Sequence, residues 1–205
     1  MNVAPWIQTF TGRAVDLVDP RSDQMHLLDI SIALGRLPRF NGHTEGARVF
    51  SVACHSLLVA DLLPRDSTPR LRLIALLHDA HEFATGDISS PMKTALRAFG
   101  GPFDSLLIIQ QRLQSCIHLA AGLGEIGEDE ADAVKQADLL ALALEARDLM
   151  PEPHPRPWGV PFPPIPGDAP ELDILDANAA GYVFSASVRS CIRSAGLTPL
   201  PSFGA

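Results

Sequence analysis

His78 and Asp79 follow the apolar run 71–77, which has the residue spacing of an amphipathic helix. Apolar side chains lie three, four and seven positions before His78, so its imidazole shares the buried face of that helix. Buried polar groups need partners, and a buried carboxylate needs a cation. A divalent metal ion would satisfy both side chains at once, which makes this pair a candidate metal site.

Glu82 lies four residues after His78 and three after Asp79, one turn further along the same predicted helix. Its carboxyl group is therefore expected beside the metal without being required as a ligand. Gly86 stands where a glycine ends a helix, and Asp87 begins the following loop. Glu82 is thus the candidate acid–base group.

Two further metal-ligand candidates lie on apolar helical faces, as a site with about four to six donors requires. His55 shares its face with Val52, Leu58, Val59 and Leu62, and Asp138 shares its face with Val134, Ala141, Leu142 and Glu145. The alternatives are a core histidine bonded to a backbone carbonyl and an aspartate paired with Lys135 or Arg147. The order H…HD…D favours a metal site.

This pattern, His55, His78–Asp79 and Asp138, resembles that of the HD-domain metal-dependent phosphohydrolases. The surrounding segments resemble the bacterial 5′-deoxynucleotidases and the related phage-type deoxyadenosine triphosphate triphosphohydrolases; these segments are 50–56, 76–93 and 134–138. The likeness covers roughly residues 25–150. It implies an all-α helical bundle that hydrolyses deoxynucleoside 5′-monophosphates or triphosphates, with a metal-activated water attacking the α-phosphorus.

The resemblance also implies a role for each matching residue. The metal ligands are His55, His78, Asp79 and Asp138, the catalytic residues are Glu82 and Asp87, and the substrate-binding residues are Arg39, Phe40, Asp87, Pro91 and Lys93. In the family the arginine contacts phosphate, and Asp87 and Lys93 match positions near the sugar and phosphates. Arg39 precedes His55 by sixteen residues, whereas the family spacing is about fifteen.

The cofactor expected is one divalent transition metal, because two imidazoles and two carboxylates suit Mn²⁺, Fe²⁺, Co²⁺, Ni²⁺ or Zn²⁺. A second Mg²⁺ or Co²⁺ on the phosphates is compatible with the resemblance. Lys93 and the cationic segment 36–48 support a triphosphate substrate, but the monophosphate alternative stays open, as does the base.

A non-catalytic nucleotide-binding regulatory module is the alternative function. The presence of all four ligand positions and of Glu82 favours catalysis instead. A zinc peptidase is excluded, because residues 78–82 lack the H-E-x-x-H order.

Length and composition are typical of one globular domain: 205 residues, 46% hydrophobic and 20% charged. Neither an apolar run of membrane-spanning length nor a basic-then-apolar leader is present, so a soluble cytoplasmic protein without membrane partners is expected. The net charge of −8 argues against nucleic-acid binding. The partners expected are a small deoxynucleotide and further copies of the chain in a homo-oligomer.

The length, the periodicity and the turn residues predict a single helical domain over 1–205, and the resemblance implies that it is an HD phosphohydrolase domain with its core at about 25–150. Helices are expected at about 22–35, 47–63, 71–86, 103–121, 129–150 and 171–195, and Thr11–Gly12–Arg13 is expected as a short strand or a turn. Loops are expected at 39–43 and 87–93. Residues 151–170 hold nine prolines and predict a non-helical strap across the surface.

Overall fold

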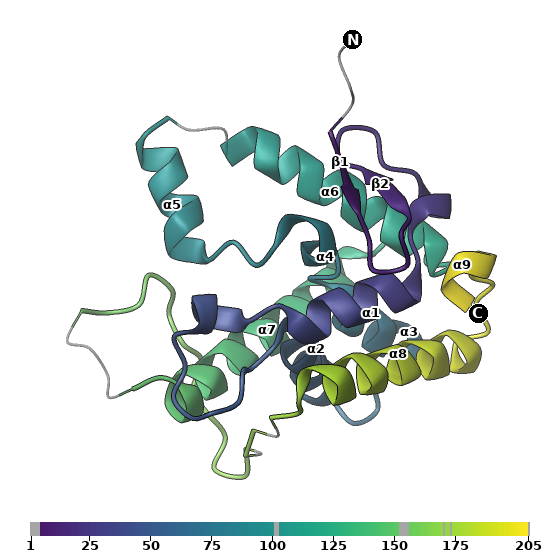
Figure 1. Cartoon of the computed structure of the whole chain (residues 1–205). Helices are drawn as coiled ribbons and strands as arrows, with labels where there is room; N and C mark the ends of the chain where they lie inside the picture. The colour runs from purple at the N-terminus through teal and green to yellow at the C-terminus, as the bar shows by residue number, and fades with distance from the viewer. Residues whose placement is uncertain (1–4, 101–102, 152–155, 170, 173, 205) are drawn as a thin grey trace.

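Most of the described chain is helical, and the helices surround one apolar core (Figure 1). The computed structural model describes residues 5–100, 103–151, 156–169, 171–172 and 174–204. The helices are α1 (Leu27–Arg36), α2 (Val52–Asp61), α3 (Pro69–Leu77), α4 (Glu82–Thr85), α5 (Ser90–Ala98), α6 (Phe103–Ala120), α7 (Glu128–Leu149), α8 (Ala177–Ser194) and α9 (Pro201–Gly204).

A small antiparallel hairpin adds to the helices, so the all-α prediction was wrong in this detail. Strand β1 (Trp6–Gln8) pairs with β2 (Ala14–Asp16), and the residues around Gly12 connect them. The buried carboxylate of Asp29 on α1 accepts hydrogen bonds from the Thr11 backbone N–H and hydroxyl at 2.7 and 2.8 Å. This contact fixes the hairpin connection on the helical core.

Helix α8 returns to the bundle and packs against α1, α2 and α3. Its closest approach is to α1, where glycines stand on both helices. A Cβ added to Gly181 would lie 2.7 Å from the Ser31 carbonyl oxygen, and one added to Gly35 would collide with the Ala177 carbonyl. Only residues without a side chain allow the two backbones to come this close.

Several helices begin later than the periodicity predicted. Residues Ser22–Gln24 form a separate 3₁₀ turn, and α1 begins only at Leu27. Helix α2 begins at Val52 instead of 47, because the Ser51 hydroxyl accepts a hydrogen bond from the Cys54 N–H at 3.2 Å. Helix α8 begins at Ala177, capped by Asp176.

The helix expected over 71–86 is interrupted between Leu77 and Glu82, which corrects the prediction of a single helix carrying His78, Asp79 and Glu82. The backbone N–H of Ala80 bonds to the Leu77 carbonyl, and that of Glu82 bonds to the Asp79 carbonyl. These i to i−3 bonds tighten the chain into a turn. Gly86 ends α4 at φ 77°, as its position predicted.

The expected loop 87–93 is shorter than predicted, because α5 already begins at Ser90. The expected loop at 39–43 is a short 3₁₀ turn, η2 (Arg39–Gly42). Backbone hydrogen bonds from Arg39 N–H to the Phe50 carbonyl and from Val52 N–H to the Leu37 carbonyl hold this turn beside the start of α2.

The proline-rich segment contains no helix or strand over 156–169, as predicted for that part. Parts of the predicted domain, of the strap and of the terminal helix lie outside the described residues, namely 1–4, 101–102, 152–155, 170, 173 and 205. Among the helices of the described chain, none combines the length and apolarity needed to cross a membrane.

Candidate metal centre

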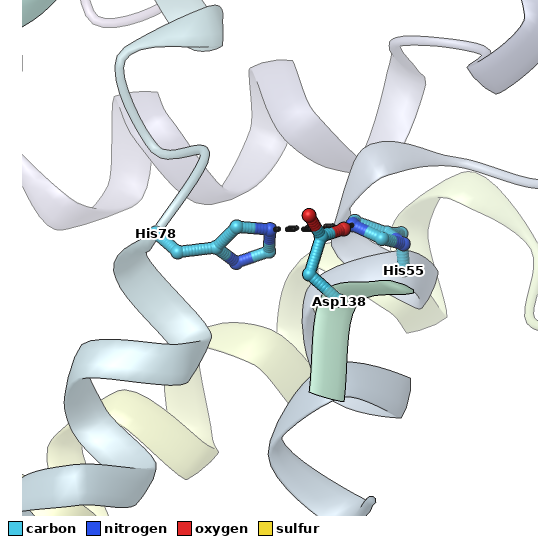
Figure 2. A group of neighbouring side chains, drawn as sticks. All are labelled: His55, His78 and Asp138. Carbon is cyan, nitrogen blue, oxygen red and sulfur yellow. Dashed lines mark hydrogen bonds and ion pairs between the residues drawn. The ribbon is translucent and has the colours of Figure 1, made fainter. Parts of the chain in front are cut away.

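Three helices bring the four predicted metal ligands to one point. His55 comes from α2, His78 and Asp79 come from the turn that directly follows α3, and Asp138 comes from α7. The His55 Nε2 lies 3.2 Å from the His78 Nε2 and 3.3 Å from the Asp138 Oδ1, and Figure 2 shows these three side chains facing one another. The Asp79 Oδ2 lies 3.2 Å from the His78 Nε2 and 3.7 Å from the His55 Nε2.

These separations fit the donor atoms of a single cation. Nitrogen and oxygen ligands lie about 2.1 Å from a transition metal, so neighbouring donors at right angles lie roughly 3.0 Å apart and opposite donors roughly 4.2 Å apart. The measured distances run from 3.2 Å up to the 4.0 Å between the His78 Nε2 and the Asp138 Oδ1. His55, His78 and Asp138 thus form a possible metal site, with Asp79 adjacent.

Hydrogen bonds on the far side of each ring determine which nitrogen faces the site. The His78 Nδ1 lies 2.7 Å from the Ala75 carbonyl oxygen, which can only accept, so this nitrogen carries the proton. The His55 Nδ1 likewise donates to the Glu145 carboxylate at 2.5 Å. Each ring thus turns its Nε2 atom toward the centre, where the two atoms lie 3.2 Å apart and would be available to bind a cation.

The surrounding charges keep the two ligand carboxylates ionised. Burial raises the pKa of Asp79, but His78 and His55 outweigh it and hold that pKa well below its ordinary value. The pKa of Asp138 is lowered in the same way, against burial, by His55, His78 and Lys135. Burial and the Arg39 charge lower the pKa of His55, yet Glu145 and Asp138 raise it overall to about 9. The site therefore attracts positive charge.

One of the two alternatives to metal binding, the pairing of Asp138 with a lysine, corresponds to a contact at the edge of the site. Lys135 does pair with Asp138, its Nζ lying 2.7 Å from Oδ2, while the other carboxylate oxygen faces the histidines. His55 bonds to a carboxylate and not to a backbone carbonyl. The lysine pairing is thus compatible with the role predicted for Asp138.

Glu145 is a site residue that the sequence interpretation did not single out. It is fully buried on α7, and its two oxygens serve different partners: Oε1 accepts from His55 and Oε2 accepts from the Arg39 Nη2 at 2.9 Å. One carboxylate therefore holds both a candidate metal ligand and the candidate phosphate-binding arginine. The signal was available, because Glu145 lies on the apolar face of Asp138, where a buried carboxylate needs a cation.

We expect Glu145→Gln to weaken metal binding by about 10- to 100-fold, because residues that orient a metal-binding histidine contribute on this scale. Metal affinity can be measured by competition with a chromophoric chelator, and Glu145→Asp should recover part of the loss. The control is Glu130→Gln on the same helix, which removes a partly exposed pair with Arg70. Equal affinities for Glu145→Gln and the wild type would contradict the role.

A second group of possible ligand atoms lies next to the first and contains Asp79, His81 and Glu82, all within 4.8 Å of one another. His81 is held by Gln114 of α6. The Gln114 Nε2 donates to the Leu77 carbonyl at 2.6 Å, so its Oε1 must face His81 and accept from the backbone N–H and Nδ1 at 3.2 Å. The Nε2 of His81 is then the nitrogen left with a lone pair.

Glu82 remains beside Asp79 although the helix between them is broken. Its side chain is 3% exposed, and its Oε2 has no hydrogen-bond partner among the described residues. Burial, followed by the charges of Asp79 and Asp87, raises the pKa of Glu82 to about 9. A buried carboxyl group with an unused oxygen is suited to proton transfer.

The predicted substrate residues are only partly brought together. Arg39 lies 3.9 Å from Asp87, measured from Nη1 to Oδ2, and its Nε has no hydrogen-bond partner among the described residues. Burial raises the pKa of Asp87, while the charge of Arg39 and, less strongly, that of Lys93 oppose this rise. Phe40 contacts Arg39. Pro91 is exposed in the first turn of α5.

The arginines of the cationic segment 36–48 have different partners. Arg36 lies over the Phe10 ring, 5.3 Å from its centroid, and Arg48 donates to the Ile174 carbonyl at 3.0 Å. Arg39 is the member that contacts Glu145 and Asp87. The segment therefore gives less support to a triphosphate substrate than its composition suggested.

Two known proteins are similar to this chain over most of its length, and no model of a known protein family matches it. The uncharacterized protein RCAP_rcc00048 of Rhodobacter capsulatus is 36% identical over 148 residues, which cover 70% of this chain and 72% of the relative. The uncharacterized protein YfdR of Escherichia coli K12 is 31% identical over 144 residues, with the same coverage of each chain. The chain therefore belongs to the protein family that includes RCAP_rcc00048 and YfdR.

Proposed function

We propose that this protein is an HD-type metal-dependent phosphohydrolase that acts on deoxynucleotides. The observation that carries the proposal is the convergence of two imidazole Nε2 atoms and two carboxylates from α2, α3 and α7, within 4.0 Å along each measured pair. The sequence order H…HD…D and the placement of Glu82 and Arg39 around this point support it further.

The cation-binding part of the site fits one transition metal held by His55, His78, Asp79 and Asp138. A bound divalent metal would lower the pKa of a water molecule and stabilise charge on the phosphoryl group. The protein's own contribution begins with Glu145, which keeps the proton of His55 on Nδ1. His78 is held in the same tautomer by the Ala75 carbonyl.

Glu82, Arg39 and Asp87 supply the remaining functions. The unpartnered oxygen of Glu82 would orient the attacking water and exchange a proton with it or with the leaving oxygen. Arg39 keeps one amino group on Glu145 and has its buried Nε–H unpartnered among the described residues, so it can donate to a phosphate oxygen. Asp87, 3.9 Å from Arg39, would then accept a hydrogen bond from the deoxyribose.

Metal analysis of the purified protein, followed by product assays on deoxynucleoside mono-, di- and triphosphates, tests the proposal directly. Release of phosphate from the monophosphate identifies a nucleotidase, and release of triphosphate identifies the triphosphohydrolase. A metal-loaded protein that binds deoxynucleotides without hydrolysing them would overturn catalysis and establish the regulatory module instead.

Arg39 and Lys93 are expected to affect substrates differently. Arg39→Ala should lower hydrolysis of every deoxynucleotide by roughly 10- to 150-fold, since a hydrogen bond to a charged group contributes about 1.5–3 kcal/mol. Lys93→Ala should reduce triphosphate hydrolysis more than monophosphate hydrolysis, because Lys93 would serve the distal phosphates. Specificity constants for both substrates give the comparison. Equal losses for Lys93→Ala would contradict the distal role and favour a simple nucleotidase.

Arg39→Ala also removes the cation that faces Glu145, so metal content must be measured in parallel. Arg39→Lys keeps a charge at that place while removing the forked guanidinium, and should retain the metal. A large loss of turnover in a metal-replete Arg39→Lys variant assigns the effect to the phosphate. The matched control is Arg36→Ala, which removes the arginine stacked on Phe10.

A further inference from the structure

The proline-rich segment that follows α7 carries an aromatic cluster next to the candidate phosphate-binding arginine. Trp158 lies edge-on to Phe40, with ring centroids 6.0 Å apart and an interplanar angle of 81°. Phe162 lies 5.5 Å from Trp158. Phe40 in turn lies against the Arg39 guanidinium, 5.4 Å from carbon Cζ to the ring centroid. Three rings, each in contact with the next, thus begin at the arginine that bonds to Glu145 at the candidate metal centre.

The two rings of the proline-rich segment are exposed but held by a restricted backbone. Trp158 is 40% exposed and Phe162 is 39% exposed. Pro157 precedes Trp158, and Pro161 and Pro163 flank Phe162. Because proline fixes its own φ and restricts the residue before it, this backbone has little conformational freedom left to lose when a ligand binds.

The backbone of Phe40, the third ring of this cluster, has an unfavourable conformation. Its φ and ψ are 53° and 29°, in the left-handed region that bulky residues rarely adopt. Residues held in such conformations concentrate at ligand-binding sites, where the surrounding structure maintains them. Here the turn that carries Phe40 is fixed by the backbone bonds between Arg39 and Phe50 and between Leu37 and Val52.

We propose that the exposed ring of Trp158, which contacts both Phe40 and Phe162, is a stacking surface for the planar base of the nucleotide whose phosphate Arg39 binds. The inference rests on the proposed function. Phe40 contacts the Arg39 guanidinium at 5.4 Å and Trp158 at 6.0 Å, so the Trp158 ring is one residue removed from the candidate phosphate-binding arginine. Aromatic rings stack on the face of any base, so the surface gives affinity for the nucleoside with little base selectivity beyond a preference for larger rings.

Tryptophan fluorescence tests the stacking, because the chain has two tryptophans, Trp6 in β1 and Trp158. In a Trp6→Phe background, Trp158 is the only remaining tryptophan. We expect a deoxynucleoside 5′-monophosphate to quench its emission, whereas deoxyribose 5-phosphate, which lacks the base, should not. Excitation must be placed where the nucleotide does not absorb. Trp158→Phe, which leaves Trp6 as the reporter, is the control for quenching unrelated to the cluster.

Trp158→Ala is expected to weaken binding of the deoxynucleotide by roughly 5- to 150-fold, from the usual contribution of one base–aromatic stack. Binding of deoxyribose 5-phosphate should stay unchanged, and KM for the nucleotide should rise more than kcat falls. The matched control is Tyr182→Ala, which removes a ring that is 76% exposed on α8. Circular dichroism and metal content confirm that each variant is folded and loaded.

The outcomes separate this inference from the proposed function. Quenching without hydrolysis supports the stacking surface and overturns the hydrolase. Hydrolysis without quenching, together with unchanged KM for Trp158→Ala, overturns the stacking surface and leaves the hydrolase standing. Absence of both quenching and hydrolysis would overturn the stacking surface and the hydrolase together. If Trp158→Ala formed a smaller oligomer and bound the nucleotide as before, the stacking surface would also be overturned. The rings would then be assigned to contact between copies of the chain.

Discussion

Glu82→Gln is expected to retain the bound metal and to lose turnover by about 10²–10⁴-fold, the usual contribution of a general acid–base group. The reason is local: glutamine keeps the shape of the side chain but can neither give nor take a proton at this place. Glu82 is suited to the role because it is 3% exposed, lies beside Asp79 and His81, and has an oxygen without a partner among the described residues.

Single-turnover kinetics on the metal-loaded protein measure this effect without interference from product release. Glu82→Ala should lose as much activity as Glu82→Gln, since both variants lack the proton-transfer group. The control is Glu128→Gln at the exposed start of α7, which should be indistinguishable from the wild type. If Glu82→Gln retained near-wild-type turnover, Glu82 would have no part in the mechanism.

Asp79→Ala is expected to remove most of the bound metal, because it deletes a charged oxygen 3.2 Å from the His78 Nε2 and 3.7 Å from the His55 Nε2. The metal would join α2, α3 and α7, so its loss should also destabilise the fold. Ligand at 100 times its dissociation constant adds about 2.7 kcal/mol to the free energy of unfolding. For a chain of this length, that corresponds to a fall in Tm of roughly 5–10 °C.

Elemental analysis and thermal unfolding with and without a chelator give the two readouts. The chelator should lower the Tm of the wild-type protein and leave that of Asp79→Ala unchanged. Asp79→Asn, which keeps the shape of the side chain, separates loss of charge from loss of packing. Asp132→Ala on the exposed face of α7 serves as the control. Metal content equal to that of the wild type in Asp79→Ala would refute the assignment of the ligand.

The sequence alone identified His55, His78 and Asp138, but not Glu145, among the side chains that meet at the site. His55, His78 and Asp138 each lie on an apolar helical face. Helical periodicity is a local property, so it can be read from a short stretch of sequence without knowledge of the fold. Burying an imidazole or a carboxylate without a partner is unfavourable in free energy, so a polar residue at such a position is expected to have a partner. The same local reasoning predicted the stop at Gly86 and the non-helical backbone found over 156–169.

Only the tertiary structure decided how the partners are connected. The break between α3 and α4 involves the hydrogen bond of His81 to Gln114, a residue 33 positions away, and periodicity carries no signal of such a contact. The sequence showed Glu145 as a polar residue on an apolar face. Its two hydrogen-bond partners, His55 and Arg39, lie 90 and 106 positions away along the chain. The separation of Arg36 and Arg48 from Arg39 likewise follows from packing against Phe10 and Ile174. Local sequence determines which groups are buried, whereas the closure of distant segments determines which partner each one finds.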